Sequence, residues 1–265
     1  MKLITWNLNK RRAIEPQIAA LSIRAPDMIA LQEVSLNNLQ RLRDGFAAVG
    51  YAYALDSVHA EPLPRRPFVM IVSRHPLYAM DVIDNPYRQG IVSAHVISSD
   101  YELVIHNVHV PSIGSHEMSV KFGFMDAVYR QLAMHESVPR IFCGDFNSPL
   151  AELADGTIIT FGQTRRVDGS YAVVKGWELY ETAERNLIEG LHAYDLRCAY
   201  RRLHGWDIQE SSWVAKNKGR EFGFRLDHIL SSEALVPVSC LYHHAWRIEN
   251  LSDHAAMEAA FIVDL

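Results

Sequence analysis

Residues 141–150 constrain most strongly what this chain can fold into, because a short apolar run leads directly into a polar turn. The first three of these residues are typical of a buried strand, and Gly144 can adopt backbone angles that other residues avoid. Asp145 and Asn147 follow, and Pro149 prevents the strand from continuing. Side chains alternate along a strand, so the acid and the amide can point the same way. Ordinary turns also use Gly, Asp and Asn, so the stretch gains weight only from the rest of the chain.

The same change from apolar to polar side chains recurs at five other strand-like segments, at 3–9, 28–31, 102–110, 224–230 and 256–263. The polar residues at or beside these strand ends are Asn7, Asn9, Glu33, Asn107, His109, Asp227, Asp253 and His254. A carboxylate that emerges from a core strand must be paired, protonated or bound to a metal. Strand ends converge in a layered sheet protein, and independent turns account poorly for six such coincidences.

The segments between these strands complete an alternating pattern of helices and strands. Apolar residues at helical spacing predict helices over 12–24, 36–49, 118–135 and 177–188. Further strands are expected at 68–73, 91–97 and 211–213. Residues 150–175 have no regular pattern, and 216–221 form an expected polar loop.

Length and composition favour a single domain over 1–265, because 265 residues are near the upper limit for one hydrophobic core and 49% of them are hydrophobic. The formal net charge of −5 lacks the basic signature of many nucleic-acid binders, although binding depends on local patches. Three cysteines without close spacing, Cys143, Cys198 and Cys240, indicate reduced thiols. No apolar run approaches a membrane span and no signal-peptide pattern opens the chain, so we expect a soluble cytoplasmic protein.

Six short motifs lie in one order along nearly the whole chain: WNLN at 6–9, LQE at 31–33, NVH at 107–109, GDFN at 144–147, RLDH at 225–228 and SDH at 252–254. Each motif is short, but the set is specific. In these motifs the chain resembles the endonuclease/exonuclease/phosphatase superfamily, which includes exonuclease III, the apurinic endonucleases, DNase I and several lipid phosphatases.

The resemblance implies a DNase I-like α/β (α+β) fold, a four-layer αββα sandwich of two packed mixed β-sheets flanked by helices. It also implies a divalent-metal phosphoesterase that uses Mg²⁺ or Mn²⁺. Glu33 would bind the metal, with Asn7 beside it and Asp253 close to it. Mg²⁺ suits such a site because it keeps several waters and needs only one or two carboxylates besides the substrate phosphate.

The resemblance also implies catalytic roles. Asp145 would position or deprotonate the attacking water, and Asn147 would hold the phosphate or that water. His254 would bond a phosphoryl oxygen, oriented by Asp227. His109 stands where the exonuclease III and apurinic branch has Tyr and where DNase I and the lipid phosphatases have His. These roles agree with a transition state that spreads negative charge over the phosphoryl oxygens.

Substrate choice rests on weaker signals. The segment SSWVAKNKGREFGFRLDHIL resembles the exonuclease III branch, which makes Trp213, Phe224 and Leu226 candidates for an apolar wall beside an abasic sugar or flipped nucleotide. Packing in the core is the alternative for these residues, and it is favoured for Leu226. The further candidate substrate contacts are Asn9, Asn107, Lys121 and Arg225.

Three functions follow from this pattern. The first is a DNA endonuclease or exonuclease, a monomer with Arg11, Arg12, Arg65 and Arg66 on the DNA backbone. The second is a phosphodiesterase or phosphatase for a small-molecule or lipid-linked phosphate, which His109 and the acidic net charge favour. The third is a catalytically silent module, which the complete set of acids and His254 disfavours. We favour the first.

Overall fold

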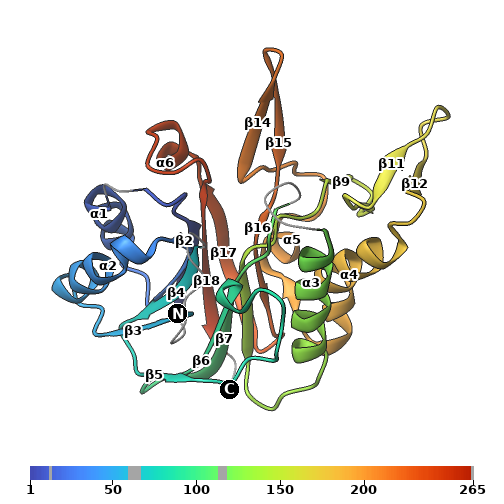
Figure 1. The fold of residues 1–265 in the computed structure, drawn as a ribbon. Coiled ribbons are helices and arrows are strands. Elements are labelled where there is room, and N and C mark those ends of the chain that lie inside the picture. The colour runs from blue at the N-terminus through green and yellow to red at the C-terminus, as the bar shows by residue number, and fades with distance from the viewer. Residues whose placement is uncertain (12–13, 59–66, 113–117, 264–265) are drawn as a thin grey trace.

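The chain forms two six-stranded mixed β-sheets that pack face to face with helices on their outer sides (Figure 1). The computed structural model describes residues 1–11, 14–58, 67–112 and 118–263. Apolar side chains from both sheets, such as Leu3, Ile71, Ile105 and Ile141, meet between the layers as a buried core. The expected four-layer αββα sandwich is thereby confirmed.

The first sheet has the strand order β17-β18-β1-β2-β4-β3. Its strands are β1 (Lys2–Asn7), β2 (Met28–Val34), β3 (Tyr53–Asp56), β4 (Phe68–Ser73), β17 (Leu235–His243) and β18 (Ala256–Val263). β1 and β2 run parallel and the other neighbours run antiparallel. Asn7 at the end of β1 therefore lies beside Gln32 in β2.

The second sheet has the strand order β13-β16-β8-β7-β6-β5. Its strands are β5 (Leu77–Ala79), β6 (Ile91–Ile97), β7 (Glu102–His109), β8 (Arg140–Asp145), β13 (Arg197–Cys198) and β16 (Asp227–Ser231). β7 and β8 run parallel, which brings His109 and Asp145 side by side at their ends.

Helices cover the outer faces of both sheets (Figure 1). On the first sheet lie α1 (Glu15–Arg24) and α2 (Leu36–Ala48); the second sheet is covered by α3 (Met118–Leu132), α4 (Glu178–Ile188) and η2 (Gly190–Tyr194). Shorter helices are η1 (Arg88–Gly90), α5 (Ala199–His204) and α6 (His244–Ile248). No helix in the described part of the chain is long and apolar enough to span a membrane.

Three hairpins differ from the expected loops. β9 (Ala151–Glu152) pairs with β10 (Ile158–Ile159), and β11 (Gln163–Arg165) pairs with β12 (Tyr171–Val173), within the region expected to be irregular. β14 (Trp213–Asn217) and β15 (Arg220–Phe224) form a hairpin, so only 218–219 of the loop expected at 216–221 form a turn and the rest is paired strand. The strand expected at 224–230 begins only at Asp227. Two of the hairpins, β11–β12 and β14–β15, project from the same end of the sandwich (Figure 1).

Backbone irregularities shape two of the strand ends. Glu33 lies inside β2 rather than just beyond it, at a bulge between Leu31 and Val34, with a φ of 52°. Bulges re-aim side chains and are common beside active sites. β8 continues through Asp145 rather than ending at Gly144, whose φ is 133° and whose Cβ would lie 2.0 Å from the Val108 carbonyl oxygen. Only glycine fits there without displacing β7.

Candidate active site

A cavity of about 520 Å³ lies at the end of the sandwich where β2, β7 and β8 terminate. Its lining includes most of the polar residues that the strand ends were expected to bring together. The lining residues are Lys10, Glu33, Pro67, Tyr87, His109, Pro111, Ser112, Asp145, Asn147, Trp213, Leu226, Asp253 and His254. Asn7 and Asp227 lie directly behind this lining, because they are hydrogen-bonded to Asp145 and His254 respectively.

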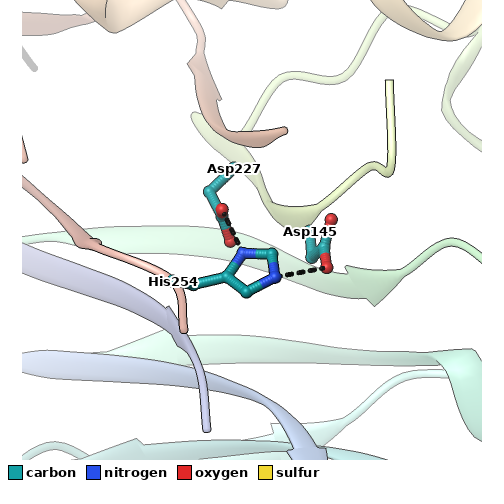
Figure 2. A group of neighbouring side chains, drawn as sticks. All are labelled: Asp145, Asp227 and His254. Atoms are coloured by element: carbon teal, nitrogen blue, oxygen red, sulfur yellow. Dashed lines mark hydrogen bonds and ion pairs between the residues drawn. The ribbon is translucent and has the colours of Figure 1, made fainter. Parts of the chain in front are cut away.

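His254 lies between two buried carboxylates (Figure 2). Its Nδ1 is 2.7 Å from Oδ2 of Asp227, and its Nε2 is 3.9 Å from Oδ2 of Asp145. Burial alone would lower the pKa of His254, but Asp227 and Asp145 outweigh burial and raise it to about 10. The imidazole is therefore a cation at neutral pH, with Nδ1 donating to Asp227.

Asp145 is held by three donors and has an unusual pKa. The Asn147 backbone N–H donates to Oδ1 at 2.8 Å, and the Asn7 amide donates to Oδ2 at 2.9 Å. The Asn147 amide adds a longer contact to Oδ2 at 3.4 Å. Burial and repulsion from Asp227 raise the pKa of Asp145 to about 7, although His254 opposes the shift. A carboxylate with a pKa near neutrality is suited to accept a proton from water.

Glu33 faces the same cavity beside Asn7, Lys10 and His109. The Asn7 amide donates to Oε1 at 3.4 Å, and Lys10 Nζ lies 3.4 Å from Oε2. Burial raises the pKa of Glu33, but His109, Lys10 and the Asn7 amide outweigh it and the net shift is downward. Burial lowers the pKa of His109 to about 4 despite the nearby Glu33 carboxylate, so this imidazole is neutral at pH 7. Glu33 is thus an ionised carboxylate that faces the cavity.

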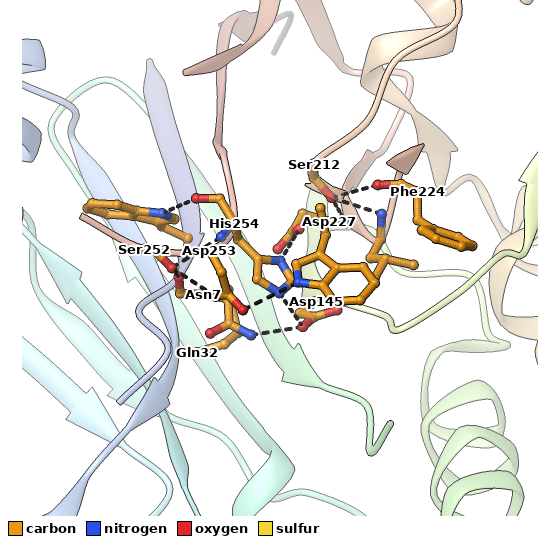
Figure 3. Close-up of polar contacts among 12 residues, drawn as sticks. Asn7, Gln32, Asp145, Ser212, Phe224, Asp227, Ser252, Asp253 and His254 are labelled. Atoms are coloured by element: carbon orange, nitrogen blue, oxygen red, sulfur yellow. Dashed lines mark hydrogen bonds and ion pairs between the residues drawn. The ribbon is translucent and has the colours of Figure 1, made fainter. Parts of the chain in front are cut away.

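Hydroxyl groups fix the segments that carry Asp227 and His254 (Figure 3). Ser212 Oγ accepts the backbone N–H of Asp227 at 3.1 Å, and Ser252 Oγ donates to the Asn7 carbonyl at 2.6 Å. Trp6 Nε1 donates to the His254 carbonyl at 3.0 Å. These contacts fix the end of β1, the start of β16 and the turn before β18, although β1 and β18 lie near opposite ends of the sequence.

Five expected substrate contacts lie outside the cavity lining, and Lys121 is one of them. Asn107 is fully buried between the sheets, where it accepts a hydrogen bond from Gln32 at 2.7 Å and donates to two strand carbonyls. Arg225 is buried and paired with Glu152. Asn9 donates its backbone N–H to Asn7 Oδ1 at 2.9 Å, and Phe224 packs against the ring of Trp213. The side chains of Asn107, Arg225 and Phe224 are therefore engaged by other parts of the protein and do not line the cavity.

Lys121 and Trp213 contact the site in different ways. Lys121 is buried on α3, and its Nζ donates to the Asn147 carbonyl at 2.8 Å, so it supports the turn after β8 without lining the cavity. Burial lowers its pKa to about 8. Trp213 lines the cavity, and its Nε1 donates to Asp253 Oδ2 at 3.3 Å. Leu226 also lines the cavity although it is mostly buried.

A model of the Endonuclease/Exonuclease/phosphatase family matches residues 4–254. The chain belongs to this family. Members of the family hydrolyse phosphoesters and depend on divalent metals. No curated protein sequence matches this family member.

Solved structures share the fold over nearly the whole chain. An AP endonuclease from Archaeoglobus fulgidus superposes with a TM-score of 0.72 at 19% identity, covering 99% of this family member and 100% of that chain. The 3′ phosphatase NExo from Neisseria, bound to a product DNA hairpin, gives 0.69 at 22% identity, with 99% of each chain covered. TDP2 from D. rerio, complexed with a single-strand DNA product, gives 0.68 at 14% identity, with 99% of each chain covered. At these identities the likeness establishes the fold.

The donor set of this family member fits a divalent metal on the Glu33 side of the cavity. Mg²⁺ prefers carboxylate oxygens and retains several waters, and Glu33 presents an ionised carboxylate near Asp145. Asp145, Asp227 and His254 also place ligand atoms within 4.8 Å of one another. The protonated His254 already supplies the positive charge among those carboxylates, so that cluster is less suited to a metal than Glu33 is.

Three residues that line or support the candidate site, Lys10, Ser212 and Tyr87, were not predicted as site residues from the sequence. Lys10 precedes two arginines in the sequence, and nothing in that basic run predicts its ion pair with Glu33. Ser212 lies in the segment that resembles the exonuclease III branch, where no role was predicted for it, and its hydroxyl binds two backbone N–H groups of the segment leading into β16. Tyr87 lines the cavity from an irregular segment before η1, where no periodic pattern marks it.

Proposed function

We propose that this chain is a Mg²⁺-dependent phosphodiesterase that acts on DNA, as an endonuclease or exonuclease. The observation that carries the proposal is the position of His254, a buried cation between Asp227 and Asp145 in the cavity that Glu33 also lines. This arrangement offers an acid, a base and a metal ligand to one phosphate.

The chemistry assigns a separate task to each group. Asp145 accepts a proton from the attacking water, because its pKa is raised to about 7. The His254 imidazolium donates a hydrogen bond to a phosphoryl oxygen, and Asp227 keeps the imidazole oriented and charged. Glu33, with Asn7 beside it and Asp253 nearby, would hold the metal. When bound, Mg²⁺ or Mn²⁺ would neutralise charge on the phosphoryl oxygens.

Two features support DNA as the substrate. The AP endonuclease, the NExo phosphatase and TDP2 share this fold, and the latter two structures hold DNA products. The β14–β15 hairpin places Trp213 at the cavity and exposed Lys218 and Arg220 beyond it, which suits an aromatic contact to a sugar or base and cationic contacts to the backbone.

The structure describes only one of the four arginines that were expected to contact the DNA backbone. Arg11 donates to the Asn250 side chain at 2.8 Å on the surface, and its position near Lys10 keeps it a candidate phosphate contact. Arg12, Arg65 and Arg66 lie outside the described residues.

A small-molecule or lipid-linked phosphate is the second candidate substrate. His109 lines the cavity as a neutral imidazole, as the resemblance to DNase I and the lipid phosphatases anticipates, and the net charge of −5 opposes polyanion binding. The two candidates use the same catalytic residues and differ only in what lies beyond the scissile phosphate.

The deciding experiment is cleavage of a labelled duplex with one abasic-site analogue, with Mg²⁺ or EDTA, by wild type, Asp145→Asn and the control Asp126→Asn. Asp126 is exposed on α3 and paired with Arg130, so its variant should behave as wild type. Mg²⁺-dependent nicking at the lesion, lost only in Asp145→Asn, supports the DNA activity. Hydrolysis of a small phosphodiester without DNA nicking supports the second candidate. DNA binding should also weaken steeply with salt.

We also propose that the protein is a cytoplasmic monomer. Its three cysteines are free, which suits a reducing compartment. Size-exclusion chromatography with light scattering tests the oligomeric state, and a dimer at micromolar concentration would overturn that part of the proposal.

A further inference from the structure

A second cavity, of about 290 Å³, lies on the other side of the catalytic strands β8 and β16. It is enclosed by the outer helices and edge of the second sheet: Ile188 comes from α4, His192 from η2, Arg201 from α5 and Arg197 from β13. Its volume is near the lower end of the range for ligand sites, which suits a small ligand.

Positive charge dominates the described lining of this cavity. It includes four arginines, Arg197, Arg201, Arg202 and Arg225, but a single carboxylate, Glu152. Three of the arginines are already engaged by the protein. Arg201 and Arg225 both pair with Glu152, and Arg202 donates to Ser231 Oγ and to the carbonyls of Ser232 and Leu235.

Two arginines retain unused donors. Arg201 is buried, and its Nε has no hydrogen-bond partner among the described residues. Arg197 is exposed at the edge strand and makes no ion pair with the described part of the chain. Arg197 can therefore donate to an anion in the cavity, whereas Arg201 Nε has almost no exposed surface and contributes only through the charge of its guanidinium.

Apolar side chains form the rest of the wall. Ile158, Ile188, Leu230 and Phe146 are all buried and line the same cavity. Trp206 adds an aromatic face and lies 4.8 Å from the guanidinium of Arg201. A ligand here would meet an apolar surface on one side and arginines on the other.

The cavity shares its wall with the candidate active site through strand alternation. Phe146 and His228 line it, and each follows directly after one of the catalytic acids, Asp145 and Asp227. The two rings lie 4.9 Å apart, and His228 Nε2 is 2.8 Å from the Ser148 carbonyl. The two cavities are therefore back to back across the same pair of strands.

We propose that this cavity is a second binding site, for a small organic anion with an aromatic or aliphatic body and a phosphate or carboxylate group. The anionic group lies against Arg197, near the positive charge of the other cavity arginines, and the apolar body lies against Ile158, Ile188 and Trp206. The site is separate from the catalytic cavity and does not depend on the function proposed above.

The test is a methyl NMR titration of the full chain with benzylphosphonate, which cannot be hydrolysed as an ester, with phenylacetate, and with benzyl alcohol as the neutral control. The δ1 methyls of Ile158 and Ile188 report the second cavity, and the methyls of Leu226 report the catalytic one. We expect saturable shifts at Ile158 and Ile188 with an anion and not with benzyl alcohol. The stronger of the two anions identifies the preferred group.

A matched pair of variants tests the role of charge. Arg197→Ala should weaken anion binding about tenfold, the effect of losing one charge-assisted hydrogen bond. Arg166→Ala, an exposed arginine on the β11–β12 hairpin, should leave it unchanged. Shifts confined to Leu226, equal binding of benzyl alcohol, or no saturable shift with either anion would each overturn the proposal. Because the readout is binding, its failure is distinct from a failure of the proposed catalysis.

Discussion

Asp145 and Asp227 are direct cross-strand partners in the antiparallel pair β8–β16, and both side chains are buried. Like charges directly opposite each other destabilise a sheet, and burial adds to the cost. The imidazolium of His254 offsets this repulsion by contacting both carboxylates. The sheet register therefore creates the electrostatic condition that keeps His254 protonated.

Replacing Asp227 should remove one of the two carboxylates that stabilise the His254 imidazolium. Asp227→Asn retains an acceptor for His254 Nδ1 but removes the charge that holds the imidazole protonated. We expect turnover to fall by about 100-fold or more, since positioned acid–base groups contribute at least that much. Steady-state kinetics of a phosphodiester substrate measure the effect, with Asp126→Asn as control. Turnover within a few-fold of wild type would refute the role of Asp227.

Glu33→Gln should weaken metal binding more than it weakens the fold. The change removes the ionised carboxylate of the cavity but retains its size and its hydrogen bond with Asn7. We expect the Mg²⁺ concentration for half-maximal activity to rise about tenfold or more, as for loss of one charged ligand. Glu136→Gln on an exposed loop is the control. An unchanged metal requirement in Glu33→Gln would place the metal elsewhere.

Gly144→Ala should destabilise the protein strongly. Its Cβ would lie 2.0 Å from the Val108 carbonyl oxygen, so β7 and β8 would have to separate. We expect the free energy of unfolding to fall by about 3 kcal/mol, as for severe overpacking. Gly219→Ala has a φ of 77° but no heavy atom within 4 Å, so it should lose only about 1 kcal/mol from backbone strain. Urea denaturation measures the free energy of unfolding of both variants. An equal decrease in the two would show that the close approach of Gly144 to Val108 is unimportant.

Glu152 should make stability depend on pH in acid. Burial alone would raise its pKa, but Arg225 and Arg201 outweigh burial and lower it from 4.5 to about 2. A lowered pKa in the folded state stabilises the protein above about pH 4.5, and this contribution disappears as the pH falls toward 2. Glu152→Gln should cost about 3 kcal/mol at pH 7. Denaturation at several pH values should show the difference from wild type narrowing below pH 4.5. A constant difference would contradict the ion-pair assignment.

Trp213 should matter more for DNA than for a small substrate. It lines the cavity at the base of the β14–β15 hairpin, where a sugar or base next to the scissile phosphate would contact it. Loss of an aromatic stacking contact costs about 1–3 kcal/mol, so Trp213→Ala should lower kcat/KM on abasic DNA roughly tenfold or more. Trp213→Phe should retain most activity. Equal losses on DNA and on a small phosphodiester would assign Trp213 to packing around Asp253 instead.

The strand-end pattern by itself predicted that Glu33, His109, Asp145 and His254 would meet, and they line one cavity. The sequence around these residues was informative because a polar side chain at the end of a core strand needs a partner or a ligand. The four predicted helices lie within a few residues of α1 to α4 because apolar spacing depends on local geometry, whereas the short helices α5 and α6 were not predicted. The β9–β10 and β11–β12 hairpins were missed because their strands are only two or three residues long, too short to show alternation. The β14–β15 hairpin was missed because its strands are largely exposed, so apolar and polar residues do not alternate clearly.

Tertiary structure alone decided which polar residues face the cavity and which are buried beside it. Asn107 resembled a site residue in sequence, yet it bridges the two sheets through Gln32. Arg225 shares its motif with Asp227 but pairs with Glu152 behind the strands. Sequence spacing fixes the face on which a side chain lies relative to its neighbours, but partners from distant segments determine its charge state and contacts. The protonation of His254 is the clearest case, because both of its carboxylate partners come from the other sheet.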